Sequence, residues 1–168
     1  MAPCLLQLNR KKAINMKLNC DLGESFGSWK MGLDDQVMPH INMANIACGF
    51  HGGDPDVIAT TLTLAKKNNV TVGAHPSYPD LQGFGRRSMA LTTSELTNCI
   101  QYQIAALEGM AKIQGLTLSY VKPHGALYND MMANNDVLAT ILSAVANYPS
   151  KLKLMILATN QADKHIQL

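Results

Sequence analysis

Four short apolar stretches, each ending on polar or ionisable residues, constrain the fold of this chain more than any other feature. They cover residues 17–24, 46–54, 70–75 and 119–124. The second reads Ile-Ala-Cys-Gly-Phe-His-Gly-Gly-Asp, which predicts a buried strand, a glycine turn and a helix with Asp54 as its N-cap and Pro55 as its first residue. Four such strand ends meeting at one place would form an active site.

Helical patterns separate these stretches. Ile58, Leu62 and Ala65 form the apolar stripe of a helix that ends at residues 68–69. The longest helix begins with a capping box at residues 92–95 and ends at Gly115. Its stripe consists of Leu96, Ile100, Ile104, Leu107 and Ala111. We also predict a short helix at 33–41, helices after 125 and a fifth strand at 152–157. Strands that alternate with helices indicate an α/β fold with a parallel sheet.

Alternation within the strands separates a polar face from an apolar face. Asn19 and Asp21 share one face of the first strand, while Tyr120, Lys122 and His124 share one face of the fourth. The same face of the two middle strands carries Asn45, Ala47, Gly49, His51, Thr71, Gly73 and His75. A doubly wound sheet would bury two apolar faces. We therefore predict a (β/α) barrel with its chemistry at the carboxyl ends of the strands.

Composition limits the class of protein. The 168 residues predict one domain, and a net charge of +2 argues against nucleic acid or a membrane as a partner. The basic residues 10–12 follow the apolar start of the chain, the reverse of a signal peptide. We interpret residues 1–15 as an extension or tag and residues 16–168 as the domain. The 4 cysteines form no C-x-x-C pair, and Cys20 and Cys48 fit buried free thiols of a cytoplasmic protein.

Ionisable residues at the strand ends are the candidates for catalysis. Asp21 and Glu24 could divide acid and base work, although a turn carboxylate and a solvated loop residue are the simpler interpretations. One histidine at a strand end is more often structural than catalytic. Three at corresponding ends, His51, His75 and His124, favour function. With Asp21 they could hold a metal ion, or they could act as acid and base without one.

Lys122 is the least ambiguous single candidate. A lysine on the inner face is costly to bury without an oppositely charged partner, and Asp21 or Glu24 could be that partner. Lys122 could also bind a substrate carboxylate or stabilise an oxyanion. Asp54 fits a helix cap best, but the same helix start, with Gly52 and Gly53, could bind an anion. No G-x-x-x-x-G-K-[ST] phosphate loop occurs. We interpret His40 and His165, which lie outside the pattern, as structural.

Four longer blocks of the sequence resemble a known family. They are residues 18–27, which include Asn-Cys-Asp-Leu-Gly-Glu-Ser-Phe-Gly, residues 44–54, residues 72–80 with 83–87, and residues 121–128, which read Val-Lys-Pro-His-Gly-Ala-Leu-Tyr. In this order they are similar to the LamB/YcsF family. The resemblance covers nearly everything from Met16 onward.

The resemblance implies a seven-stranded (β/α) barrel of the glycoside hydrolase/deacetylase type. It also implies hydrolytic opening of 5-oxo-L-proline to L-glutamate, with ATP as co-substrate of a complex that includes subunits B and C. On this basis we assign catalysis to Asp21, Glu24, His51, His75, Lys122 and His124. We assign substrate binding to Asn19, Asn45, Gly52, Gly53, Asp54 and Arg86. A divalent metal, if present, would be held by Asp21, His51 and His75.

Family members are longer than this chain, so we expect a barrel that lacks its closing strands and exposes the edges of its first and fifth strands. Two alternatives therefore accompany the family function. One is a metal-dependent deacetylase-like hydrolase acting on an N-acyl or sugar substrate. The other is an inactive, truncated relative that only binds partner subunits.

Overall fold

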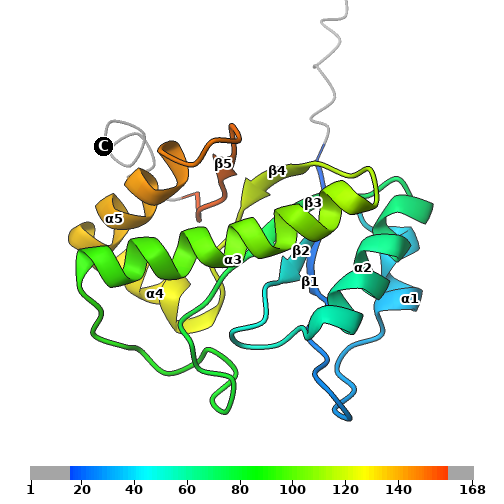
Figure 1. The fold of residues 1–168 in the computed structure, drawn as a ribbon, viewed down its shortest axis with the longest axis horizontal. Coiled ribbons are helices and arrows are strands. Elements are labelled where there is room, and N and C mark those ends of the chain that lie inside the picture. Colours follow the sequence, from blue (N-terminus) through cyan, green and yellow to red (C-terminus); the bar gives the residue numbers. More distant parts are fainter. Residues whose placement is uncertain (1–15, 159–168) are drawn as a thin grey trace, which may run out of the picture.

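The structure is a computed structural model, which describes residues 16–158. Within that range five parallel strands form one sheet in the order β1-β2-β3-β4-β5 (Figure 1). The strands are β1 (Asn19–Leu22), β2 (Met43–Ala47), β3 (Thr71–His75), β4 (Leu118–Val121) and β5 (Lys153–Leu154). Strand order follows chain order, which is the arrangement of a barrel wall and not of a doubly wound sheet.

Helices connect the strands and pack on the sheet. They are α1 (Asp34–Val37) with the 3₁₀ turn η1 (Met38–His40), α2 (Pro55–Lys67), α3 (Thr93–Ile113), α4 (Gly125–Ala133) and α5 (Asn135–Ala146). The long helix α3 crosses in front of the strands, with α2 beside one end and α4 and α5 beside the other (Figure 1). The α/β fold with a parallel sheet is therefore confirmed. Closure into a seven-stranded barrel stays a prediction.

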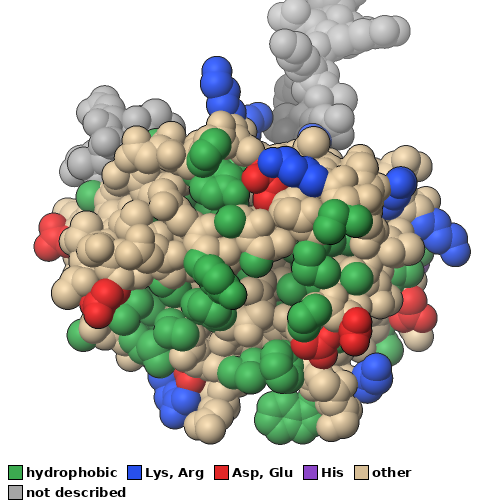
Figure 2. All heavy atoms as spheres, viewed as in Figure 1, with side chains coloured by type: hydrophobic (Ala, Val, Ile, Leu, Met, Phe, Trp, Pro, Cys, Tyr) green, Lys and Arg blue, Asp and Glu red, His purple; other side chains and the backbone are tan. Residues whose placement is uncertain are grey.

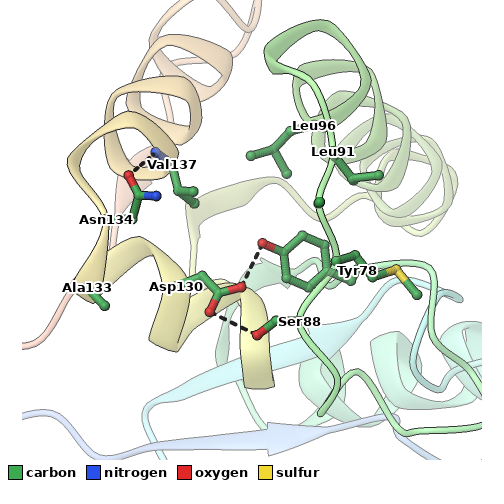
Figure 3. A pocket seen from close by; sticks show the side chains of 10 residues that line it. Tyr78, Ser88, Leu91, Leu96, Asp130, Ala133, Asn134 and Val137 are labelled. Atoms are coloured by element: carbon green, nitrogen blue, oxygen red, sulfur yellow. Dashed lines mark hydrogen bonds between the residues drawn. The ribbon is translucent and has the colours of Figure 1, made fainter.

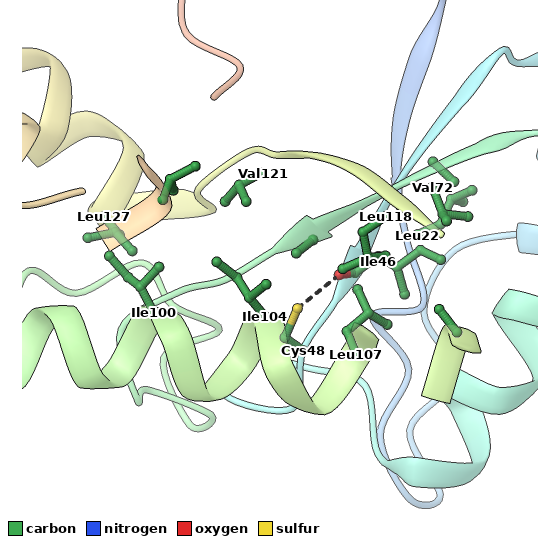
Figure 4. Close-up of a cluster of buried hydrophobic side chains, with 14 of the residues drawn as sticks. Leu22, Ile46, Cys48, Val72, Ile100, Ile104, Leu107, Leu118, Val121 and Leu127 are labelled. Carbon is green, nitrogen blue, oxygen red and sulfur yellow. Dashed lines mark hydrogen bonds between the residues drawn. The ribbon is translucent and has the colours of Figure 1, made fainter. Parts of the chain in front are cut away.

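The hydrophobic core lies between α3 and the apolar face of the sheet. Figure 4 shows Ile100, Ile104 and Leu107 of α3 facing strand residues such as Ile46 and Val121, all of them buried. Burial of such aliphatic side chains contributes about 1.5–3 kcal/mol each. The stripe predicted for α3 is therefore its core-facing side.

The predicted helix starts are confirmed. Asp54 accepts hydrogen bonds from the backbone N–H groups of Asp56 and Val57, and Pro55 opens α2. Thr92 and Glu95 form a capping box at the start of α3. Both signals depend only on neighbouring residues, so the sequence contains all the information that they need.

Several predicted boundaries were wrong. The fifth strand comprises only Lys153–Leu154, because it pairs with β4 through just those two positions. The predicted short helix at 33–41, by contrast, is confirmed to within one residue at each end, although its second half is a 3₁₀ turn that contains a proline. Lys122 directly follows β4 instead of lying inside it, and Cys20 is only partly buried because β1 is an edge strand.

The surface agrees with the small net charge. Acidic and basic side chains lie scattered over the face shown in Figure 2 and do not gather in one patch. In residues 16–158 no helix combines the length and apolar character that crossing a membrane requires. Residues 1–15, predicted as an extension, and His165 lie outside the described residues.

Candidate active site

All six predicted catalytic residues come together at the carboxyl ends of the strands. Asp21 lies in β1 and Glu24 in the loop that follows. His75 is the last residue of β3, while the loops after β2 and β4 supply the others. Those others are His51, Lys122 and His124. Parallel strands end at the same edge of a sheet, which explains why residues up to 103 positions apart meet there.

Three histidine rings surround the carboxylate of Glu24. Its Oε1 atom lies 3.1 Å from His51 Nε2, 3.4 Å from His124 Nδ1 and 3.9 Å from His75 Nε2. The rings of His51 and His124 stack with their centres 3.7 Å apart. One ligand atom from each of these four residues lies within 4.8 Å of all the others, so the cluster could hold a metal ion. We call these residues the histidine–glutamate cluster. Its carboxylate is Glu24, where the sequence suggested Asp21.

A polar row crosses the inner face of the sheet beside the cluster. Asp21, Asn45, Gly73 and Tyr120 are neighbours in register across β1 to β4. The Tyr120 hydroxyl donates to Asn45 Oδ1 at 2.7 Å, and Asn45 Nδ2 donates to Asp21 Oδ1 at 2.7 Å. The Lys122 ammonium lies 2.6 Å from the same Asp21 oxygen. Asp21 is thus the partner that the sequence required for Lys122.

Charge and burial set the protonation states of these groups. Burial opposes ionisation of Asp21, but the nearby His75 ring and the hydrogen bonds from Lys122 and Asn45 outweigh it and hold its pKa far below the usual range. Burial is likewise outweighed at Glu24, whose pKa the His51 hydrogen bond lowers. Burial and the neighbouring imidazoles lower the pKa of His124 to about 4. At neutral pH the site therefore combines two carboxylates with an uncharged His124.

The loop before α3 adds a residue that the sequence did not indicate as part of the site. The Phe84 carbonyl accepts a hydrogen bond from His124 Nε2 at 2.9 Å, and its ring meets the His51 and His124 rings edge-on. Phe84 has a φ of 54°, which non-glycine residues rarely adopt. The only sequence signal was the Gly-Phe-Gly triplet at 83–85. The sequence pattern placed Tyr120 on the inner face of the sheet but did not indicate that it belongs to the site.

The predicted substrate-binding residues have different surroundings. Asn19 and Asn45 hydrogen-bond to each other at 2.7 Å within the inner face. Asp54 is occupied as the cap of α2 and also accepts from the Gly27 N–H. Arg86 is exposed, with its guanidinium 5.8 Å from the Phe84 ring centre.

Gly52 and Gly53 pack against the backbone of residues 23–24. A Cβ atom on Gly52 would lie 2.7 Å from the Glu24 carbonyl oxygen, and Gly53 adopts a φ of 81°. The absence of a side chain at these two positions therefore lets the turn after β2 approach the Glu24 loop closely. Contact of any of these residues with a substrate stays a prediction.

Hollows of different sizes lie near these elements. A small one of about 120 Å³ adjoins the cluster, and Glu24, His51, Phe26, Trp29, Met31, Leu81, Gln82 and Phe84 line it. A larger one of about 540 Å³ lies between the 88–91 loop and α4 and α5 (Figure 3). There Tyr78 and Ser88 both donate to Asp130, at 2.9 and 3.0 Å, so these polar side chains satisfy one another. Of these two, the small hollow is the one lined by residues of the histidine–glutamate cluster.

The sequence profile of the LamB/YcsF family matches residues 16–167. The chain belongs to the LamB/YcsF family. Its relatives include the 5-oxoprolinase A subunit numbered 2 of Pseudomonas putida, which is 61% identical over 84% of this chain and 55% of that protein. The 5-oxoprolinase A subunit of Vibrio parahaemolyticus is 52% identical over 97% of this chain and 63% of that protein.

A solved LamB/YcsF-like structure confirms the fold. The lactam utilization protein from Thermus thermophilus superimposes with a TM-score of 0.85 at 43% identity, over 90% of this chain and 61% of that one. The LamB/YcsF chain described here therefore spans about three fifths of the length of the relatives that it matches.

Proposed function

We propose that this chain carries catalytic residues of an ATP-dependent 5-oxoprolinase, which hydrolyses 5-oxo-L-proline to L-glutamate. One observation carries the proposal: two carboxylates, three imidazoles and an ammonium group converge at the carboxyl ends of parallel strands. The names of the relatives, which describe a 5-oxoprolinase and a lactam utilization protein, support a cyclic amide as substrate. A cytoplasmic location belongs to the same proposal.

Ring opening of a lactam requires three things of a site. Water must lose a proton as it adds to the carbonyl carbon, the oxyanion so formed must be stabilised, and the ring nitrogen must gain a proton when the C–N bond breaks. The ionised Asp21 and Glu24 can accept the proton that water loses, and an imidazole that takes up this proton can pass it to the ring nitrogen. Lys122 supplies the positive charge for the oxyanion or for the substrate carboxylate.

ATP would activate the lactam by transferring its γ-phosphoryl group to the lactam oxygen, with ADP as the leaving group, which makes the ring carbon more electrophilic. After water adds and the C–N bond breaks, a second water would hydrolyse the acyl phosphate that remains to glutamate and phosphate. The sequence contains no Walker-type phosphate loop. We therefore propose ATP as a co-substrate of the whole complex, formed with partner subunits B and C. The relatives are themselves named as subunits, which supports an assembly of this kind.

A second candidate is a metal-dependent hydrolase of the deacetylase type acting on an N-acyl or sugar substrate. The histidine–glutamate cluster favours it, because imidazole and carboxylate are common ligands of catalytic metals. The two candidates differ in their product, since only the first releases glutamate from 5-oxoproline.

Reconstitution tests the proposal. The chain is mixed with cognate B and C subunits, 5-oxo-L-proline and ATP, and glutamate and ADP are quantified. Lys122→Met should lower the rate about 10²–10³-fold, because it removes one charge that acts on the oxyanion or carboxylate. His40→Ala, at an exposed position outside the site, should not. Absence of glutamate, when a full-length relative succeeds in the same assay, would assign this chain to the inactive alternative.

A further inference from the structure

We propose that Glu24, His75 and His124 bind one divalent transition-metal ion of the zinc class, and that His51 is a positioning residue that orients Glu24. The histidine–glutamate cluster therefore divides into three ligands and one supporting residue. A catalytic role for the ion rests on the proposed function, whereas binding of the ion does not.

Hydrogen bonds to the backbone fix the tautomers of two rings. His75 Nδ1 lies 2.5 Å from the Lys122 carbonyl oxygen, and His124 Nε2 lies 2.9 Å from the Phe84 carbonyl oxygen. A peptide carbonyl only accepts hydrogen bonds, so each of these nitrogens carries its ring's hydrogen. The other nitrogens, His75 Nε2 and His124 Nδ1, then present lone pairs to each other at 3.0 Å. Two lone pairs at this distance repel unless a positive ion lies between them.

Distances within the cluster match the size of a metal ion. His75 Nε2, His124 Nδ1 and Glu24 Oε1 form a triangle with sides of 3.0, 3.4 and 3.9 Å. The circle through these three atoms has a radius of about 2.0 Å, close to zinc–nitrogen and zinc–oxygen bond lengths. Both rings are almost fully buried, at 1% and 2% exposure, so they are held in this orientation.

His51 fits a supporting role better than a ligand role. Its Nδ1 atom is buried and has no hydrogen-bond partner. If Nε2 bound the ion, a neutral ring would carry its hydrogen on Nδ1 and would bury an unpaired N–H group. If instead Nε2–H donates to Glu24 Oε1, 3.1 Å away, only an unused lone pair remains at Nδ1, and this costs less. Residues that orient a ligand in this way commonly support metal sites.

Asp21 is not one of the proposed metal ligands, because it already interacts with other residues. Its Oδ1 atom accepts from Lys122 and Asn45, while its Oδ2 atom lies 3.4 Å from His75 Nε2. It is therefore beside the proposed site, at a place from which it can act on a water molecule. Two imidazoles and one carboxylate are a ligand set typical of catalytic zinc sites, which keep a further position for water.

Metal titration of the full 168-residue chain, without a polyhistidine tag, tests the inference. The chain is treated with a chelator and titrated with Co²⁺ by calorimetry and visible absorption, and then with Zn²⁺. We expect one equivalent of Co²⁺ per chain, the visible bands of four-coordinate cobalt, and their loss when Zn²⁺ displaces it. A folded wild-type chain that binds neither ion would overturn the inference.

Variants identify the ligands. His75→Ala and His124→Ala should abolish the cobalt bands, and the nearly isosteric Glu24→Gln should do so with less disturbance of the fold. His51→Ala should keep the stoichiometry but weaken binding about 10–100-fold. His40→Ala is the matched control and should bind as wild type does. Wild-type binding by the two ligand-histidine variants would also refute the assignment.

These readouts need neither substrate nor partner subunits. One equivalent of metal without glutamate release in the reconstitution would leave the metal site standing and refute the proposed function. Glutamate release by a chain that binds no metal would do the reverse.

Discussion

At the scale of single residues, Gly73 determines how the polar row is built. A Cβ atom on Gly73 would lie 2.3–2.5 Å from the ring of Tyr120. The glycine therefore provides space, through which the Tyr120 ring passes over β3 to reach Asn45 on β2. Asn45 in turn holds Asp21, so a missing side chain on one strand positions a carboxylate two strands away.

Replacing Gly73 with alanine should therefore displace Tyr120 and destabilise the protein by about 1–3 kcal/mol, the usual cost of overpacking. Gly109→Ala is the matched control, because Gly109 lies in α3 and a Cβ atom added there would meet nothing within 4 Å beyond its chain neighbours and the backbone of its own helix. It should stabilise the protein by about 0.5–1 kcal/mol. Urea unfolding measures both. Equal effects of the two substitutions would show that space at Gly73 is not the constraint.

Tyr120→Phe isolates the hydroxyl group. The substitution keeps the ring but leaves the buried Asn45 oxygen without its donor, which should cost about 1–3 kcal/mol of the free energy of unfolding. Tyr102→Phe is the control, since its side chain is 63% exposed and the change should be near neutral. If both variants unfold at the same urea concentration as wild type, the Tyr120 hydroxyl contributes nothing to the stability of the polar row.

At the scale of elements, the 80–87 loop is held by one carboxylate. Asp80 accepts hydrogen bonds from the backbone N–H groups of Gly83 and Arg87 and forms an ion pair with the Arg87 guanidinium. The Arg87 hydrogen bond is the main reason that the pKa of Asp80 falls to about 2. These contacts between Asp80 and Arg87, which we call the Asp80 clamp, keep the Phe84 carbonyl in place to accept the hydrogen bond from His124.

Asp80→Asn should loosen that loop and speed tryptic cleavage at Arg86 and Arg87, with a smaller loss of global stability. In wild type the contribution of the ion pair is complete above the ordinary carboxyl pKa of 3.8 and is lost as the pH falls through about 2. The variant should therefore lose less stability between pH 4 and 2, as urea unfolding would measure. Gln82→Ala, a substitution at an exposed position of the same loop, controls for a general increase in loop mobility. Cleavage at the wild-type rate in Asp80→Asn would contradict the clamp.

Elements with local signals were predictable, and those that depend on strand partners were not. Thr92 and Asp54 cap their helices as the sequence indicated, because a cap involves only nearby residues. The parity of the strands correctly placed Asp21 and Tyr120 on one face. Their contact through Asn45 could not be predicted, because it depends on the register of four strands and on an irregularity between Val72 and Gly73. The tautomers in the cluster likewise depend on backbone carbonyls from distant loops.

At the scale of the whole molecule, the described sheet has two edges. β1 pairs only with β2, and β5 only with β4. Leu18, just before β1, is 58% exposed. An unpaired edge with an exposed apolar side chain favours association with another strand.

Leu18→Lys should therefore reduce self-association of this chain, because a charged residue at an edge opposes strand pairing. Sedimentation velocity over a range of concentrations measures the change. Ile113→Lys, at a position 87% exposed at the end of α3, is the control and should have little effect. If both substitutions reduce association equally, general surface hydrophobicity is the cause and not the edge.

The sequential strand order also has a consequence for synthesis on the ribosome. Each strand pairs with the one made just before it, so the sheet can grow as the chain emerges, without waiting for a distant partner. Lys122 and His124 emerge only after β4. The nascent chain therefore brings the last two of the six ionisable groups to the site only after its fourth strand is made, so shorter nascent chains do not yet carry an assembled site.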